Sequence, residues 1–399
     1  MSVNTMSFEQ ASAFLTALYQ EATGQYPAIQ IANTSDYISV GTTLLQGGVD
    51  PIIGALAQII DRTIFSIRPY AQKFKDLNVT EAIWGSVTRK INFIDTPLDV
   101  NDERLTLTDG LGVDPWIVKK PKVMQTNFYG ATQYQDHISI FKDQLESALK
   151  DPAEGARFFS GVIQNITDKL AQIREAEARG ILANFITGKV AGDTANCINV
   201  LQAYYDETGT TLTPGTMFDV TNYTTFVRWL AGFMQTLTEK MAERSLKYHM
   251  NVTGLEVMRH TEDRFLRKYI SSNVINHIKA TASSNLYNAD EVKKWIANAE
   301  SVSFWQNIED PYTIDATPTY LDVSNGQLIV AGSDVKLENI IGFLFDVEAL
   351  GMCTRSTWSA STGLNPAGGF YNIFYHFTQT TWNDFTENAV VLYADTVTP

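Results

Sequence analysis

The fold of this chain is decided by residues 151–188, which read DPAEGARFFSGVIQNITDKLAQIREAEARGILANFITG. Asp151 is a favourable N-cap residue and Pro152 suits the first helical turn, whereas Gly188 ends the pattern. Between them, apolar side chains recur three or four residues apart, as on one stripe of a helix. The stripe consists of Phe158, Val162, Ile166, Leu170, Ile173, Ile181, Leu182 and Phe185. The spacing predicts one helix of about 35 residues, or about 50 Å at 1.5 Å per residue.

A helix of this length is about three times the average and needs a sheet or another subunit to lie along. A shorter amphipathic helix opens the chain, because Ser7 and Gln10 form a capping-box pattern and Gly24 ends the apolar periodicity. This helix either docks on its own domain or acts as an arm on a neighbouring subunit, and the sequence leaves both possibilities open.

Residues 78–141 have the texture of short β segments. Residues 90–94 alternate with period two, and residues 117–129 form a second extended stretch. The polar span 95–112 between them predicts a long hairpin with little core of its own. Because an isolated two-stranded ribbon is marginal in water, we expect this hairpin to lie against another surface.

The rest of the chain mixes helices and strands. Apolar residues at helical spacing predict a second long helix over 223–241, and shorter helices are expected near 262–269 and 290–299. The last quarter reads as strands at 327–331, 340–346, 369–377 and 389–393. The predicted fold class is α+β, with a mixed sheet and one dominant helix.

The composition excludes several classes of protein. Of 399 residues, 44% are hydrophobic and 19% charged, which is typical of a chain with a real core. Asp and Glu outnumber Lys and Arg by 44 to 30, so the net charge of −14 repels phosphate, and no basic run exceeds Lys119-Lys120. A sequence-specific DNA reader is therefore not expected. Cys197 and Cys353 are too few for a disulfide scaffold or a zinc cluster.

Targeting signals are not visible in the sequence. Residues 1–10 have neither a basic nor an apolar region of the kind that makes a signal peptide. No apolar stretch approaches the ~20 residues that a membrane helix needs. We therefore expect a soluble protein that is synthesised in a cytoplasm and has no membrane partner.

Motifs for catalysis or cofactor binding are not found either. The sequence has no phosphate-binding loop, nucleophile elbow, zinc-protease motif or paired Cys-x-x-Cys, and its five histidines show no metal-ligand spacing. The best enzymatic lead is two pairs of acids. Asp346 and Glu348 would share one face of a strand, and Asp384 and Glu387 stand near aromatic residues. Acids at strand ends and turns are routine in so acidic a chain, so we predict no catalytic residue, no cofactor and no metal.

Several stretches resemble a known family. They are residues 62–70 (RTIFSIRPY), 120–129 (KPKVMQTNFY), 188–196 (GKVAGDTAN), 345–351 (FDVEALG) and 382–392 (WNDFTENAVVL). Together with the order of arm helix, hairpin, long helix, mixed region and final β segments, they resemble the major capsid proteins of tailed double-stranded DNA bacteriophages, which have the Hong Kong 97 phage fold. The resemblance covers roughly residues 60–395, and its segments are similar to capsid proteins of small phages of Gram-positive and gut bacteria.

The resemblance implies a role for each part of the chain. The implied division is an N-terminal arm at 1–60, a peripheral-domain strand and extended hairpin loop at 61–150 (the loop at about 78–130), a spine helix of the peripheral domain at 151–188, an axial domain at 189–338, and return strands of the peripheral domain with the C-terminus at 339–399.

The implied function is that of a structural subunit without catalysis. Copies of the chain would assemble into hexamers and pentamers of an icosahedral-type shell around the phage DNA, which they would enclose without reading its sequence. The expected partners are the chain itself, a portal, and scaffold or minor capsid proteins. The implied location is the virion, after synthesis in the bacterial host cytoplasm. Two alternatives stay open: an encapsulin-like compartment shell, and an acidic intracellular hydrolase that uses Asp346 with Glu348 or Asp384 with Glu387.

Charged residues of the hairpin are candidates for contacts between subunits. They are expected to form ion pairs with the next copy, and because exposed pairs contribute only about 0–1 kcal/mol each, they would set register more than affinity. The candidate interface residues are Arg89, Lys90, Asp102, Glu103, Arg104, Lys119, Lys120 and Lys122.

Overall fold

The computed structural model describes residues 7–62, 73–79, 87–94, 120–283 and 299–398, together with positions 109, 112, 116 and 118. The chain divides into two compact units. Unit 1 comprises Met1–Ser86, Gly130–Glu177 and Met352–Thr381. Unit 2 comprises Val87–Tyr129, Ala178–Gly351 and Trp382–Pro399.

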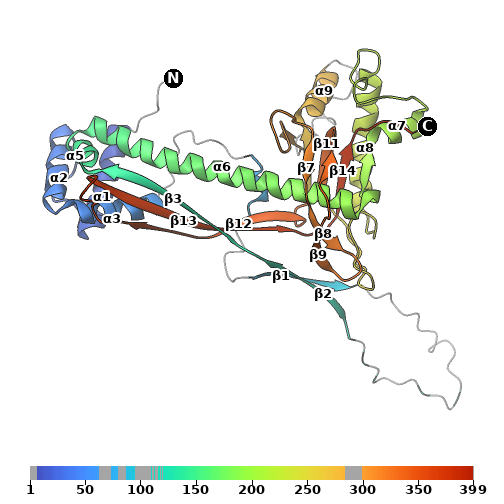
Figure 1. Ribbon diagram of the computed structural model, residues 1–399, viewed down its shortest axis with the longest axis horizontal. Coiled ribbons are helices and arrows are strands. Elements are labelled where there is room, and N and C mark those ends of the chain that lie inside the picture. The colour runs from blue at the N-terminus through green and yellow to red at the C-terminus, as the bar shows by residue number, and fades with distance from the viewer. Residues whose placement is uncertain are drawn as a thin grey trace. The chain divides into compact units, whose positions relative to one another are not determined.

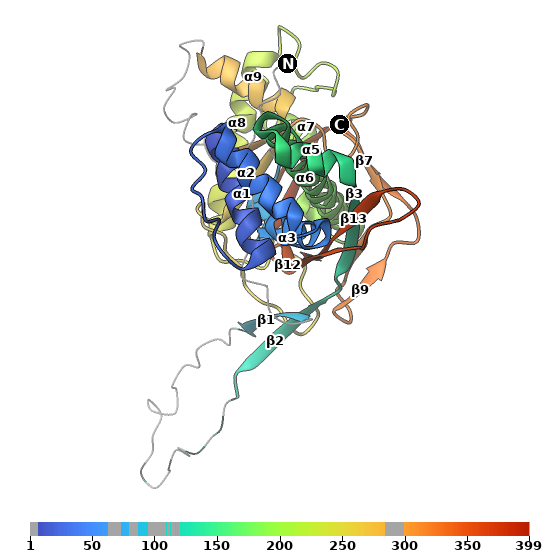
Figure 2. The ribbon, with the colours of Figure 1, turned by 90° about the vertical axis from the view of Figure 1, so that its left-hand side faces the viewer.

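Unit 1 begins with three helices, α1 (Phe8–Thr23), α2 (Thr34–Gln46) and α3 (Val49–Arg62). The predicted capping box of α1 is present, and Gly24 ends the helix in the left-handed conformation at φ 73°. The three helices pack with α5 (Lys142–Lys150) and the first half of α6 into one core. Figures 1 and 2 show them grouped there. The first helix therefore docks on its own unit, which was the first of the two alternatives.

A three-stranded antiparallel sheet completes unit 1, in the order β12 (Leu350–Ser361), β13 (Phe370–Asn383) and β3 (Thr132–Phe141). β13 and β3 alternate between a more buried and a more exposed face, as period two requires, whereas β12 begins with four buried residues. Tyr371 and Ile373 of the buried face belong to the helical core. The strand predicted at 369–377 is confirmed and runs further, to Asn383.

The long helix is confirmed as α6, which runs from Pro152 to Gly192 over 41 residues. The Asp151 side chain accepts a hydrogen bond from the backbone N–H of Ala153 at 3.0 Å, as expected of an N-cap. In unit 1, Phe159 of α6 packs against Phe14 of α1 with ring centroids 4.4 Å apart. In unit 2, Phe185 stacks on Phe385 at 4.6 Å.

Unit 2 is built on a five-stranded sheet in the order β4 (Cys197–Asn199), β14 (Ala389–Tyr393), β11 (Ile340–Asp346), β5 (Leu266–Ser271) and β6 (Ala299–Val302). The sheet is mixed. The edge strands are parallel to their neighbours, β4 to β14 and β6 to β5, whereas β11 is antiparallel to both β14 and β5. One face packs on α8 (Tyr223–Ala242), with Ile341 and Leu344 of β11 in that core. Phe343 of the same strand meets Phe185 of α6.

Smaller elements surround this sheet. Two short helices, α7 (Val200–Thr208) and α9 (Ser272–Ser283), flank α8. Three two-stranded sheets pair β1 (Val87–Ile94) with β2 (Lys122–Tyr129), β7 (Ile314–Ala316) with β10 (Val335–Leu337), and β8 (Thr319–Asp322) with β9 (Gln327–Val330). Among the described residues, unit 2 also has a short 3-10 helix at Thr194–Asn196, and unit 1 has one at Lys75–Leu77.

One sequence prediction is wrong in a way that has a physical cause. The helix predicted near 262–269 is instead a turn followed by β5, which starts at Leu266. β5 lies between β11 and β6, so two ladders of hydrogen bonds override the local helical spacing. The helix expected near 290–299 and the hairpin tip at 95–112 lie almost wholly outside the described residues.

Two helical glycines of unit 1 give a matched test of this packing. A Cβ on Gly41 of α2 would lie 2.0 Å from the backbone oxygen of Leu149, whereas a Cβ on Gly54 of α3 would meet nothing within 4 Å. We expect Gly41→Ala to reduce the free energy of unfolding by about 1–3 kcal/mol through overpacking. Gly54→Ala should raise it by about 0.5–1 kcal/mol, because alanine loses less backbone entropy. Urea denaturation checks both, and equal effects would contradict the packing of α2 on α5.

Candidate functional site

The base of the β1–β2 hairpin contains a cluster of buried and half-buried charged residues of unit 2. In the antiparallel register Lys90 faces Thr126 and Asn92 faces Met124, so these four side chains share one side of the ribbon. This side is turned towards the unit, because Met124 is 6% exposed and the Lys90 side chain 17%. The opposite side carries Arg89, Ile91, Phe93 and Val123 and is exposed.

Lys90 is surrounded by three carboxylates of its own chain. Its Nζ lies 2.9 Å from Oε2 of Glu348, in the turn after β11, and 3.1 Å from Oδ2 of Asp384. It also donates to Oε1 of Glu387, which follows in the same connection to β14. Asp384 and Glu387 have side chains only 1% and 6% exposed, whereas Glu348 is 64% exposed. The two buried acids therefore carry most of the interaction.

Arg259 connects the same acids to the hairpin from a second direction. Its Nη2 lies 3.0 Å from Oε1 of Glu387, and its Nε donates to the backbone oxygen of Thr386 at 3.0 Å. Its Nη1 donates to Oδ1 of Asn92 on β1, also at 3.0 Å. One guanidinium thus joins the hairpin to the connection before β14, a geometry that suits the fixed fork of an arginine.

The ionisation of this cluster reflects burial and mutual attraction. Burial alone would lower the pKa of Lys90, but the carboxylates of Asp384, Glu387 and Glu348 outweigh it and raise that pKa. Burial raises the pKa of Glu387 to about 7, with a further contribution from Asp384 and against the attraction of Lys90 and Arg259. Lys90 therefore stays charged at neutral pH, while Glu387 is the group that titrates there.

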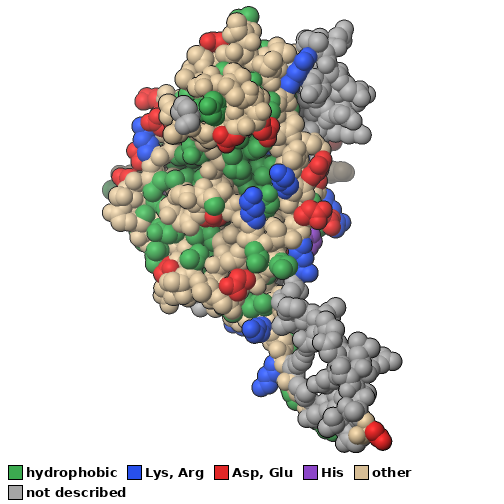
Figure 3. Space-filling view, turned by 90° about the vertical axis from the view of Figure 1, so that its right-hand side faces the viewer, with side chains coloured by type: hydrophobic (Ala, Val, Ile, Leu, Met, Phe, Trp, Pro, Cys, Tyr) green, Lys and Arg blue, Asp and Glu red, His purple; other side chains and the backbone are tan. Residues whose placement is uncertain are grey.

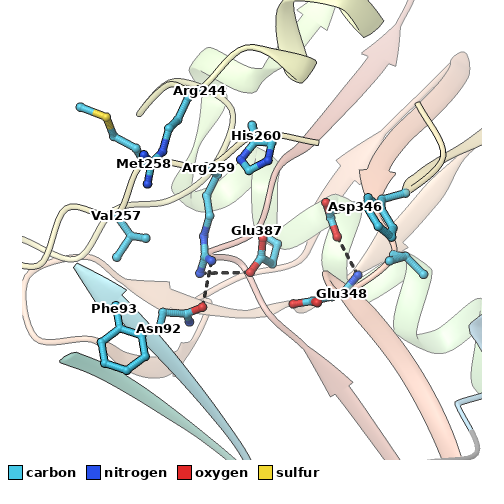
Figure 4. A pocket seen from close by; sticks show the side chains of 12 residues that line it. Asn92, Phe93, Arg244, Val257, Met258, Arg259, His260, Asp346, Glu348 and Glu387 are labelled. Atoms are coloured by element: carbon cyan, nitrogen blue, oxygen red, sulfur yellow. Dashed lines mark hydrogen bonds and ion pairs between the residues drawn. The ribbon is translucent and has the colours of Figure 1, made fainter. Parts of the chain in front are cut away.

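A pocket of about 320 Å³ opens beside the cluster (Figure 4). Arg259 points across it towards Asn92 and Glu387, and Phe93 contributes an apolar wall. The other lining residues are Arg244, Val257, Met258, His260, Phe265, Asp346, Val347 and Glu348. Acidic and basic groups are mixed and largely engaged with each other, so the arrangement anchors the hairpin and does not define a site for an anion or a cation.

The acid pairs that were the enzymatic lead have structural partners. Asp346 ends β11 and Glu348 lies in the following turn, so the prediction that they share one face of a strand is wrong. Asp346 accepts a hydrogen bond from Thr261 at 2.7 Å and one from the backbone N–H of Glu348 at 2.9 Å. Asp384 and Glu387 are bound to Lys90. Each acid therefore has a partner that holds the fold together, either in its own turn or on β1.

The candidate interface residues fall into three groups. Lys90 is engaged with acids of its own chain, which differs from the expected partner in the next subunit. Arg89, Lys120 and Lys122 are exposed. Asp102, Glu103, Arg104 and Lys119 lie outside the described residues.

Other kinds of site are not found in the described part of the chain. No group of three or more His, Cys, Asp or Glu side chains there could hold a metal ion, and both cysteines are free thiols. On the face shown in Figure 3, acidic and basic side chains are interspersed and form no basic patch. No described helix is long and apolar enough to cross a membrane.

The architecture defines a class of protein, because solved structures share it. One is the capsid structure of Staphylococcus phage Andhra, with 10% identity, coverage of 84% of this chain and 87% of that chain, and a TM-score of 0.55. Another is a chain from the structure of the head fiber and inner core protein gp22 of native bacteriophage P68, with 10% identity, coverage of 83% and 86%, and a TM-score of 0.54. The fold is thus one found in phage heads.

The family follows from the sequence itself. Residues 15–393 match the sequence model of the Phi29-like phage major capsid protein family, so this chain belongs to that family. A comparison with curated protein sequences gives no match. The family match confirms the resemblance to phage major capsid proteins, and the chain has a structural role in a phage shell.

The anchor of the hairpin can be tested by removing its central cation. Lys90→Met leaves Asp384 and Glu387 buried with one cation fewer, and breaking a buried ion pair in this way typically reduces the free energy of unfolding by about 3–5 kcal/mol. Arg89→Met is the matched control, because Arg89 is the neighbouring residue on the exposed side of the strand and its loss should change stability by about 0.5 kcal/mol or less. Equal stability of the two variants in urea would contradict the anchor.

The raised pKa of Glu387 predicts a dependence of stability on pH. The folded state holds a proton on Glu387 up to about pH 7, and the unfolded chain only up to its usual value of 4.5. The contribution of this group is therefore fully present below pH 4.5 and is lost as the pH rises through 7. Glu387→Gln removes that loss, so its stability relative to the parent should increase between pH 5 and pH 8. Parallel pH profiles of the parent and Glu387→Gln would refute the assignment.

Proposed function

We propose that this chain is the repeating subunit that self-assembles into the closed shell of a tailed phage. The observation that carries the proposal is the family match over residues 15–393. The same match favours a phage shell over an encapsulin-like compartment. It also favours a non-enzymatic role over a hydrolase, in agreement with the structural partners of Asp346 and Asp384.

The exposed side of the hairpin supports a contact with a neighbouring copy. Ile91, Phe93 and Val123 are 56%, 68% and 45% exposed, although they lie on one side of a ribbon whose other side is anchored. Adjacent apolar side chains left in water on a two-stranded ribbon favour burial against a partner. We assign that partner to the next subunit. Charged residues would set the register of this contact. They are Arg89, Lys120 and Lys122, which are exposed, and Asp102, Glu103, Arg104 and Lys119, which lie outside the described residues.

The segments of the chain take their roles from the same proposal. Residues 1–60 contribute an N-terminal region that contacts a neighbour, residues 61–150 the peripheral strand and hairpin loop, and residues 151–188 the spine helix. Residues 189–338 form the axial domain that meets its copies at the centre of a capsomer, and residues 339–399 return to the peripheral domain.

The assembled particle follows from repetition of these contacts. We propose hexamers and pentamers in a shell of icosahedral type that encloses double-stranded DNA without reading its sequence. The net charge of −14 repels phosphate, so DNA would be bound only weakly, which suits packaging and release of the genome. A portal and scaffold or minor capsid proteins would complete the head. The protein would be made in the host cytoplasm and reside in the virion.

Electron microscopy of the gently purified protein, together with its mass in solution, tests this function. Closed shells or capsomer rings of uniform size are expected, with or without the other head proteins of the phage. A protein that stays monomeric when those head proteins are added would refute the proposal.

The hairpin contact makes a sharper prediction. Ile91→Ser with Phe93→Ser removes the exposed apolar side chains and keeps the ion pairs of Lys90 and the hydrogen bond of Asn92, so the subunit should fold and assemble poorly. Val220→Ser is the matched control, because Val220 is 97% exposed and lies outside the hairpin. The yield of shells in electron micrographs and the thermal midpoint of the subunit are the measurements. Normal yields from the double variant would contradict the contact.

A further inference from the structure

The β8–β9 hairpin of unit 2 presents a second unpartnered surface, distinct from the β1–β2 hairpin. β8 and β9 pair antiparallel, with Thr319 opposite Val330 and Leu321 opposite Leu328. The turn between them is closed by Asp322, whose backbone oxygen accepts from the N–H of Gly326, a residue at φ +72°. In the described part of the chain, β9 pairs only with β8.

One backbone hydrogen bond shows which way the backbone groups of each strand point. Ala331 N–H donates to the oxygen of Pro318 at 2.8 Å, so Pro318 and Ala331, which lie opposite each other, form a hydrogen-bonded pair. Hydrogen-bonded and non-hydrogen-bonded pairs alternate along an antiparallel ladder. Thr319–Val330 and Leu321–Leu328 are therefore non-hydrogen-bonded pairs, and their N–H and C=O groups point away from the partner strand.

The outer edge of β8 confirms this alternation. The side-chain amide of Asn184 on α6 makes two hydrogen bonds to the backbone of Thr319. Its Nδ2 donates to the Thr319 oxygen at 3.1 Å, and its Oδ1 accepts from the Thr319 N–H at 2.8 Å. The outward groups of β8 are therefore satisfied by the body of unit 2 at this position. The corresponding groups of Leu328 and Val330 point away from β8, on the opposite edge.

The side chains of β9 are as exposed as its edge. Leu328, Ile329 and Val330 are 56%, 37% and 68% exposed, so both sides of the strand face solvent. No charged residue occurs from Val323 to Ser333. Natural edge strands are normally protected by a charge, a proline or a bulge, and β9 has none of these.

We propose that the outer edge of β9 pairs with an extended strand from a second copy of this chain. A strand is the partner that satisfies a row of outward N–H and C=O groups, and the apolar side chains on both sides would be buried with it. Every copy carries a net charge of −14, so copies repel one another except where their surfaces are uncharged, as at residues 323–333. The inference rests on the proposed function, because it requires that many copies assemble.

Hydrogen exchange at single-residue resolution tests the pairing in the unmodified protein. In the unassembled subunit the amide of Ile329, which bonds to β8, should exchange slowly, and those of Leu328 and Val330 should exchange fast. In shells the amides of Leu328 and Val330 should slow by at least about tenfold and join Ile329. Unchanged rates in shells would overturn the inference and leave the proposed function intact. A chain that never assembles would overturn both the inference and the proposed function. Slow exchange of Leu328 and Val330 that appears only when a different protein is added would overturn the assignment of the partner to a second copy.

A pair of variants separates backbone pairing from side-chain contact. Val330→Pro removes an outward N–H without removing a hydrogen bond to β8, whereas Val330→Ala keeps the N–H and loses most of the side chain. We expect Val330→Pro to lower the yield of shells by at least about tenfold, and Val330→Ala to retain most of it, with similar thermal midpoints for both subunits. Equal losses from the two variants would overturn strand pairing.

Discussion

One apolar stripe on a 41-residue helix is the constraint on which the rest of the structure depends. At 1.5 Å per residue this helix is about 60 Å long, and no single core of a chain this size can bury a stripe of that length. The helix instead contributes to two cores. Phe159 packs with the N-terminal helices in one, and Phe185 packs with β11 in the other. Each unit thus obtains a central element from the same helix, with Phe159, Ile166 and Phe185 buried within the chain.

The second constraint is a hairpin that has no core. A two-stranded ribbon gains little from its own contacts, so its direction is fixed by what its base is bound to. Lys90 fixes the base through ion pairs with Asp384 and Glu387, and Asn92 does so through its hydrogen bond from Arg259. Since side chains alternate along β1, turning the polar residues inward necessarily turns Ile91 and Phe93 outward. The anchor and the exposed apolar side are two consequences of one register.

The elements that could be predicted from the sequence are those with long local patterns. The helices at 152–192 and 223–242 and the strands at 340–346 and 389–393 were predicted within a few residues, because each carries a sustained period in its own apolar residues. β5 was missed because its state depends on pairing with β11 and β6. The site was missed in the same way, since Arg259 and Asn92 are 167 residues apart and neither has a local signal. Asp384 and Glu387 attracted attention as acids, yet only the fold identifies Lys90 as their partner.

The acidity of the chain explains where contacts between copies should lie. Two surfaces that are both negative repel over a Debye length of about 8 Å at physiological salt, so attraction between copies must come from short-range burial and backbone hydrogen bonds. Two described surfaces offer such contacts: the side of the β1–β2 hairpin with Ile91 and Phe93, and the uncharged edge of β9. Contacts of this kind are weak individually and gain strength by repetition over a lattice. A subunit whose net charge opposes non-specific contact then associates in few arrangements, which favours one regular shell over disordered aggregation.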